Sequence, residues 1–88
     1  MKYVVRMTKK ATKGVEKLPL RAVDTLARLI CDLRDFGPIQ PKYSHFSKIG
    51  NGCFHCHLGI HWVVCWKTDG TGGSVEVYYV GSRESAPY

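Results

Sequence analysis

The chain has 88 residues, enough for one hydrophobic core, so we expect a single domain spanning residues 1–88. Hydrophobic residues make up 44% of the sequence, which is typical of a globular protein and argues against a disordered one. Thirteen Lys and Arg against seven Asp and Glu give a formal net charge of +6, which favours a polyanionic partner such as nucleic acid. A solvated surface with a chance excess of lysine is the alternative.

The first residues contain neither the apolar core nor the cleavage site of a signal peptide. No stretch of the sequence is long enough to span a bilayer. The cysteines are Cys31, Cys53, Cys56 and Cys65. An even number of cysteines forms disulfides only in an oxidising compartment. We therefore expect a cytoplasmic protein with reduced thiols and no membrane partner.

The N-terminal part of the sequence predicts a strand and a short basic helix. Residues 3–7 alternate and are rich in β-branched side chains, which indicates a strand. Thr8 can cap a helix over the following residues, although Gly14 lowers the helix propensity there. The basic residues of this helix either form a solvated face or contact RNA phosphates. The candidates for RNA contact are Lys9, Lys10 and Lys13.

A second, longer helix is expected to follow. Pro19 suits its first turn, and from Leu20 onward apolar residues recur at steps of three and four. This spacing predicts one apolar stripe along a helix of about five turns. Gly37 and Pro38 then end the helix.

The C-terminal half predicts a loop and three strands. Residues 38–52 contain two prolines and two glycines, which indicates a loop. The strands are expected at residues 53–58, 60–67 and 75–80. Residues 69–73 are glycine-rich and lie between two strands, which predicts a hairpin loop and disfavours a phosphate-binding loop.

The order of these elements is strand, helix, helix, strand, strand, strand. Because helices and strands are segregated along the chain, we predict an α+β fold. Both helices should cover one face of a mostly antiparallel, four-stranded sheet that the first strand joins, since a lone strand is not stable. The other face remains free for function. The core is expected to contain Leu26, Ile30, Leu33, Phe54, Cys56 and Leu58.

The segment of residues 53–58, Cys-Phe-His-Cys-His-Leu, contains the strongest candidates for chemistry. Alternate side chains of a strand share a face. Cys53, His55 and His57 should therefore point away from the core, and His61 lies just across the following turn. Partly buried histidines that only fill a sheet face are the structural alternative.

A zinc site is a further possibility for the same segment, since Cys-x-x-Cys with neighbouring histidines offers suitable ligand types. The alternation of the strand sends Cys53 and Cys56 to opposite faces, however. A second ligand pair is also missing downstream. We therefore expect no metal.

Metal-free cleavage of RNA needs a base for the 2′-hydroxyl, an acid for the leaving oxygen and cations for the phosphate charge. Histidine can act as base or acid near neutral pH, arginine pairs with phosphate oxygens, and aromatic rings stack on bases. A tyrosine that merely packs on the sheet is the alternative for the C-terminal tail. The candidate catalytic residues are His55, His57, Arg83 and Tyr88, and further candidate RNA contacts are Lys48 and His61.

Together these motifs resemble the RelE-type family of toxin nucleases, in the order of elements over nearly the whole chain. The likeness is closest in the C-terminal half, which resembles a branch of the family described as cytotoxic translational repressors. It rests on residues 55–58, His-Cys-His-Leu, on the strand ending at Trp66, and on residues 75–81 with the polar run to Tyr88. The resemblance implies a RelE-like fold, a ribosome-dependent endoribonuclease that cleaves mRNA without a cofactor, and a cognate antitoxin protein.

Family members use basic residues on the second and third strands, an arginine after the last strand and a tyrosine near the end. Arg83 and Tyr88 match the last two, whereas His55, His57 and His61 lie where members have permanently charged residues. Histidines would hold a phosphate less firmly at pH 7. The resemblance therefore leaves open a binding protein of the same fold without RNase activity, either gyrase-directed or inactive, and less favourably a zinc-binding module.

Overall fold

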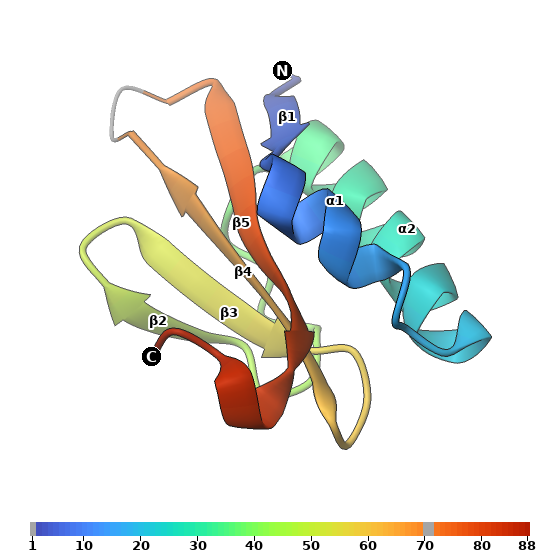
Figure 1. Cartoon of the computed structure of the whole chain (residues 1–88). Coiled ribbons are helices and arrows are strands. Elements are labelled where there is room, and N and C mark those ends of the chain that lie inside the picture. The colour runs from blue at the N-terminus through green and yellow to red at the C-terminus, as the bar shows by residue number, and fades with distance from the viewer. Residues whose placement is uncertain (1, 70–71) are drawn as a thin grey trace.

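Two helices cover one face of a five-stranded mixed sheet (Figure 1). The computed structural model describes residues 2–69 and 72–88. The elements are β1 (Val4–Met7), α1 (Lys9–Val15), α2 (Leu20–Phe36), β2 (Ser47–Gly50), β3 (Cys53–His57), β4 (Trp62–Thr68), β5 (Ser74–Ser82) and the 3-10 helix η1 (Arg83–Ser85). The strand order is β1-β5-β4-β3-β2, in which β1 pairs with β5 in parallel and all other pairs are antiparallel.

The predicted α+β class and both helices are confirmed, but the sheet has five strands where the sequence predicted four. The additional strand is β2, which lies inside the predicted loop and pairs with β3 at the edge of the sheet. It is short, and a register shift between Lys48 and Gly50 interrupts its alternation, so it lacks the pattern of a strand. Of the predicted hairpin loop, Gly70 and Thr71 lie outside the described residues.

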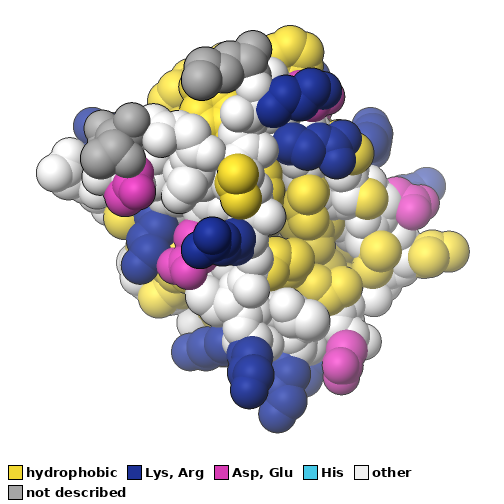
Figure 2. Space-filling view, turned by 90° about the horizontal axis from the view of Figure 1, so that it is seen from above, with side chains coloured by type: hydrophobic (Ala, Val, Ile, Leu, Met, Phe, Trp, Pro, Cys, Tyr) yellow, Lys and Arg dark blue, Asp and Glu magenta, His cyan; other side chains and the backbone are white. Residues whose placement is uncertain are grey.

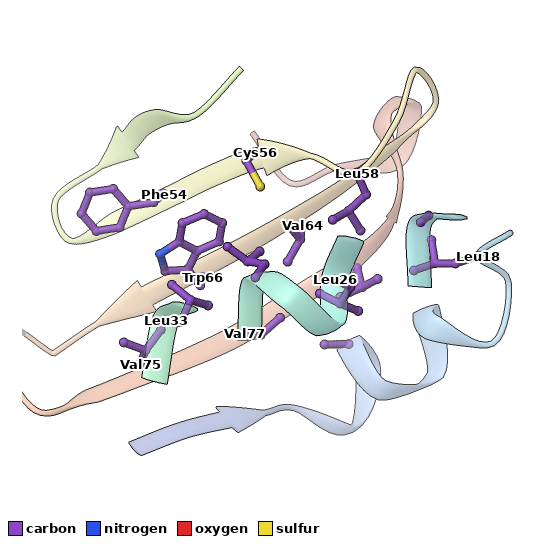
Figure 3. Close-up of a cluster of buried hydrophobic side chains, with 14 residues drawn as sticks. Leu18, Leu26, Leu33, Phe54, Cys56, Leu58, Val64, Trp66, Val75 and Val77 are labelled. Atoms are coloured by element: carbon purple, nitrogen blue, oxygen red, sulfur yellow. The ribbon is translucent and has the colours of Figure 1, made fainter. Parts of the chain in front are cut away.

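The core lies between α2 and the sheet. Figure 3 shows Leu26 and Leu33 of α2 directed toward side chains of β3 and β4, among them Phe54, Cys56 and Trp66. Of the predicted core, Leu26, Leu33, Phe54, Cys56 and Leu58 are buried, whereas Ile30 is only partly buried and packs against the cluster. No helix in the described part of the chain is long and apolar enough to cross a membrane.

Gly14 allows α1 to lie directly on β5. A Cβ atom at this position would lie 1.8 Å from the carbonyl oxygen of Val80 in β5, a separation far too short for non-bonded atoms. We expect Gly14→Ala to lower the free energy of unfolding by about 1–3 kcal/mol, because the backbone of an inner strand yields little. This loss runs against the higher helix propensity of alanine.

Urea denaturation measures this effect, and Gly59→Ala is the matched control. A Cβ atom at Gly59 would meet its nearest neighbour, in Trp62, at 3.9 Å, which is ordinary contact. We therefore expect the control to change stability little. Equal stability of both variants would contradict the close approach of α1 to β5.

Candidate functional site

The two strand histidines lie on the face of the sheet opposite the helices. Phe54 and Cys56 belong to the core under the helices. His55 lies opposite Cys65 across the β3–β4 pair, and Cys65 belongs to a separate small cluster with Val63 and Tyr79. The predicted assignment of faces on β3 is therefore confirmed.

The C-terminal tail folds back over His55. Ser82 caps η1 by accepting a hydrogen bond from the backbone N–H of Ser85, and the chain then returns toward β2 and β3 (Figure 1). The ring of Tyr88 lies against the ring of His55, with centroids 4.5 Å apart and planes at 52°. Because Tyr88 covers it, His55 is only 8% exposed even though α1 and α2 lie on the other face.

A third histidine, His45, joins the cluster from the loop before β2. Its ring stacks on that of His57, with centroids 4.3 Å apart. The backbone N–H of His57 donates to the carbonyl of Ser44 at 2.8 Å, which holds the loop against β3. His45 adopts the left-handed backbone conformation, with φ 55°. Sequence reasoning did not single out His45 as a site residue, because nothing in its spacing links it to β3.

The surroundings of both strand histidines lower their pKa values and so favour the neutral imidazole. Burial lowers the pKa of His55 below its ordinary value of 6.5, and the charge of His45 acts in the same direction, while a hydrogen bond with the backbone of Ser47 opposes them. Ser47 Oγ lies 3.0 Å from Nδ1 of His55. Burial also lowers the pKa of His57, followed by the charges of His45, His55 and Arg83. Each imidazole therefore has one nitrogen at neutral pH that can accept a proton.

Tyr88 and Arg83 supply the complementary chemistry. The hydroxyl of Tyr88 is protonated at neutral pH, as a general acid must be, and burial raises its pKa further. Arg83 is exposed at the start of η1, and its charge acts on both Tyr88 and His57. Its backbone N–H donates to the carbonyl of His61 at 2.8 Å, which fixes η1 beside the β3–β4 turn. A proton acceptor, a proton donor and a cation thus share one end of the open face.

The remaining candidate residues lie elsewhere. His61 is exposed in the β3–β4 turn. Lys48 lies opposite Phe54, and because directly opposed residues share a face, its side chain emerges on the helix side of the sheet.

Lys10 and Lys13 of α1 line a pocket with Ser82 and Ser85, and Lys9 lies on the same helix. Lys10 and Lys13 therefore border the start of the tail and lie apart from the histidines.

Two buried cysteines beside the histidines, Cys56 and Cys65, are not disposed for chemistry at neutral pH. Burial raises the pKa of Cys56 and of Cys65 to about 12, so both remain protonated thiols. Among residues 2–69 and 72–88, no three side chains of His, Cys, Asp or Glu are arranged to hold a metal ion.

The lowered histidine pKa values predict how stability depends on pH. The folded state favours neutral imidazole, whereas the unfolded chain takes up protons near pH 6.5. The contribution of these histidines to the free energy of unfolding should therefore be fully present above about pH 6.5 and should decline as the pH falls below it. Melting temperatures measured from pH 8 to pH 5 test this.

In the variant His55→Gln, the glutamine side chain has no charge at any pH. The melting temperature of this variant should therefore fall less steeply with decreasing pH, although its stability at any one pH also changes because the ring contact is lost. His61→Gln, at an exposed position, is the matched control and should keep the pH dependence of the parent. A parent protein equally stable at pH 5 and pH 7.5 would show that these histidines are not buried as neutral groups.

Comparison with known proteins finds similarity in structure alone. No family model and no curated protein matches the sequence. A chain of the archaeal RelE–RelB complex from Pyrococcus horikoshii matches with a TM-score of 0.79 at 19% identity, over 98% of this chain and 100% of that one. A chain of the DinJ–YafQ toxin–antitoxin complex from Escherichia coli matches with a TM-score of 0.78 at 14% identity, over 100% of both chains.

A third solved structure, a metal-bound toxin from Helicobacter pylori, matches with a TM-score of 0.68 at 20% identity, over 93% of this chain and 96% of that one. At such identities the likeness shows the fold. The chain therefore has the RelE-like α+β fold that its sequence predicted.

Proposed function

We propose that this protein is the toxin of a type II toxin–antitoxin pair, a ribosome-dependent endoribonuclease that cleaves mRNA in the cytoplasm and so represses translation. The observation that carries the proposal is the cluster on the open face, where the rings of His55, His57 and Tyr88 lie together. Arg83 is near enough for its charge to act on His57 and Tyr88. The RelE-like fold supports it, because chains of toxin–antitoxin complexes share this architecture.

The proposed reaction needs no metal ion or cofactor. His57 removes the proton of the 2′-hydroxyl, and the resulting oxygen attacks the neighbouring phosphorus. The bond from phosphorus to the 5′-oxygen breaks, and Tyr88 donates its proton to that oxygen. Arg83 pairs with the phosphate oxygens as their charge develops. The products are a 2′,3′-cyclic phosphate and a free 5′-hydroxyl.

His57 suits the role of base better than His55. His57 is only partly buried, and the charge of Arg83 acts on it. His55 is 8% exposed, Ser47 occupies its Nδ1, and Tyr88 lies against its ring. His55 is therefore proposed to position Tyr88, whereas His57 meets the substrate.

The basic residues outside the cluster are proposed to hold RNA. Lys9, Lys10 and Lys13 of α1, with Lys48 and His61, would contact phosphates of the mRNA or of the ribosome. The net charge of +6 supports a polyanionic partner of this kind.

A cognate antitoxin is the proposed protein partner. At the end of the molecule where β1 meets the C-terminus of α2, Figure 2 shows a hydrophobic surface with Lys and Arg on two sides. Val4, Phe36 and Ile39 are exposed large hydrophobic residues of β1, α2 and the loop after it. Such a surface suits an acidic amphipathic segment, which would bury the apolar side chains and neutralise the cations.

Pulse labelling of bacteria after induction of the gene tests the proposal. Incorporation of methionine into protein should fall first, growth should stop, and co-expression of the product of the adjacent gene should restore both. A gyrase-directed toxin of the same fold would instead reduce thymidine incorporation first. Harmless expression of the folded protein would contradict a toxin of either kind.

A further inference from the structure

A pocket of about 490 Å³ adjoins the candidate site, within the range of about 300–1,000 Å³ typical of small-ligand sites. One wall is α2, another is the loop before β2, and His57 at the end of β3 forms part of the third. His57 thus borders both this pocket and the histidine cluster on the open face. None of the reaction steps proposed above uses the other residues of the pocket.

Two cations and one carboxylate line this pocket. Arg28 comes from α2 and is exposed, and Lys42 comes from the loop. The carboxylate of Asp32 lies 3.1 Å from Lys42 Nζ, and the hydroxyl of Tyr43 donates to it. This hydrogen bond and the neighbouring lysine hold the pKa of Asp32 below its usual range, so the group is ionised at neutral pH. The three charged groups therefore leave one net positive charge.

The donors and acceptors of the pocket match a nucleotide. Arg28 and Lys42 can only donate hydrogen bonds, which suits phosphate oxygens, whereas Asp32 can only accept them. The hydroxyls of a ribose and the amino groups of a base are donors that Asp32 can bind. The hydroxyl groups of Thr25 and Ser44, which also line the pocket, can do either.

We propose that this pocket binds the nucleotide next to the scissile phosphate, with Arg28 and Lys42 on its phosphate and Asp32 on its ribose or base. The identity of the occupant as part of an RNA substrate rests on the function proposed above. The position of His57 between pocket and cluster is the reason for placing the two nucleotides side by side.

Titration of nucleoside 5′-monophosphates into the ¹⁵N-labelled protein tests the pocket without requiring cleavage. Shifts of backbone amides should concentrate at residues 25–32, 42–44 and 57. Arg28→Ala and Lys42→Ala should each weaken binding at least about tenfold, as expected for the loss of a hydrogen bond between charged groups. Arg34→Ala is the matched control: it removes the same side chain from the same helix, but one paired with Asp35 outside the pocket.

Shifts confined to the lysines of α1, or equal weakening by Arg34→Ala, would overturn the pocket as a nucleotide site. So would a glutamate-rich peptide that binds the same amides more tightly than the nucleotides, since it would indicate a protein partner. Nucleotide binding that survives in a protein without cleavage activity would instead refute the proposed function and leave the pocket in place.

Discussion

Replacing Arg83 with alanine is expected to lower mRNA cleavage on programmed ribosomes by about two orders of magnitude, the usual cost of losing one contact to the charge of a transition state. Arg83 is exposed, and its charge acts on both Tyr88 and His57. A guanidinium in this position can pair with two phosphate oxygens at once. The fold should persist, because the side chain lies outside the core.

Arg6→Ala is the matched control for this variant. It removes an exposed arginine from β1 and so lowers the net charge by the same amount. Cleavage by Arg6→Ala should resemble that of the parent. Melting temperatures of both variants distinguish a loss of chemistry from a loss of folding.

Tyr88→Phe separates the two roles of the C-terminal ring. The phenylalanine ring can still lie against His55, but it has no proton to donate. Cleavage should fall while the melting temperature stays unchanged. If both Arg83→Ala and Tyr88→Phe cleave like the parent, the proposed site is wrong.

The largest loss of stability is expected from Trp66→Ala, at about 3–5 kcal/mol. Trp66 is fully buried between α2 and the sheet (Figure 3), and its ring packs near those of Phe46 and Phe54, with centroids 6.0 Å and 6.3 Å away. Its Nε1–H also donates to the carbonyl of Pro38 at 3.0 Å, which fixes the loop after α2. Small domains are stable by only about 5–15 kcal/mol, so this variant should be close to unfolding.

Urea denaturation measures the loss, with Trp62→Ala as the control. Trp62 lies on the same strand and loses the same atoms, but it is only partly buried and packs at the margin of the core. Its replacement should cost clearly less. Equal losses for the two variants would contradict the placement of Trp66 at the centre of the core.

The sequence was most informative where one regular pattern ran without interruption. The apolar stripe and the stop at Gly37 predicted the extent of α2, and the alternation of β3 predicted the face of each side chain. β2 escaped prediction because four residues with an irregular register carry no such pattern. From the sequence, Gly14 only lowers the helix propensity of α1. The structure shows that a glycine is required there, because α1 approaches β5 too closely for a side chain at this position.

The candidate site was only partly predictable, for a different reason. Alternation tells which face a strand residue occupies, but it does not tell what lies over that face. The burial of His55 depends on the return of the tail to Tyr88, and the position of His45 depends on the backbone contact between His57 and Ser44. Both are contacts between segments far apart in the sequence, which local pattern does not encode.

Metal-free cleavage of mRNA by the cluster on the open face can be measured by incubating the purified protein with ribosomes programmed with a defined mRNA and mapping the new 5′-ends. We expect cuts in the mRNA at the decoding site, fragments that carry a 5′-hydroxyl, and about a hundredfold slower cleavage by Arg83→Ala. An mRNA that remains intact on ribosomes exposed to the folded parent protein would show that the protein is not such a nuclease.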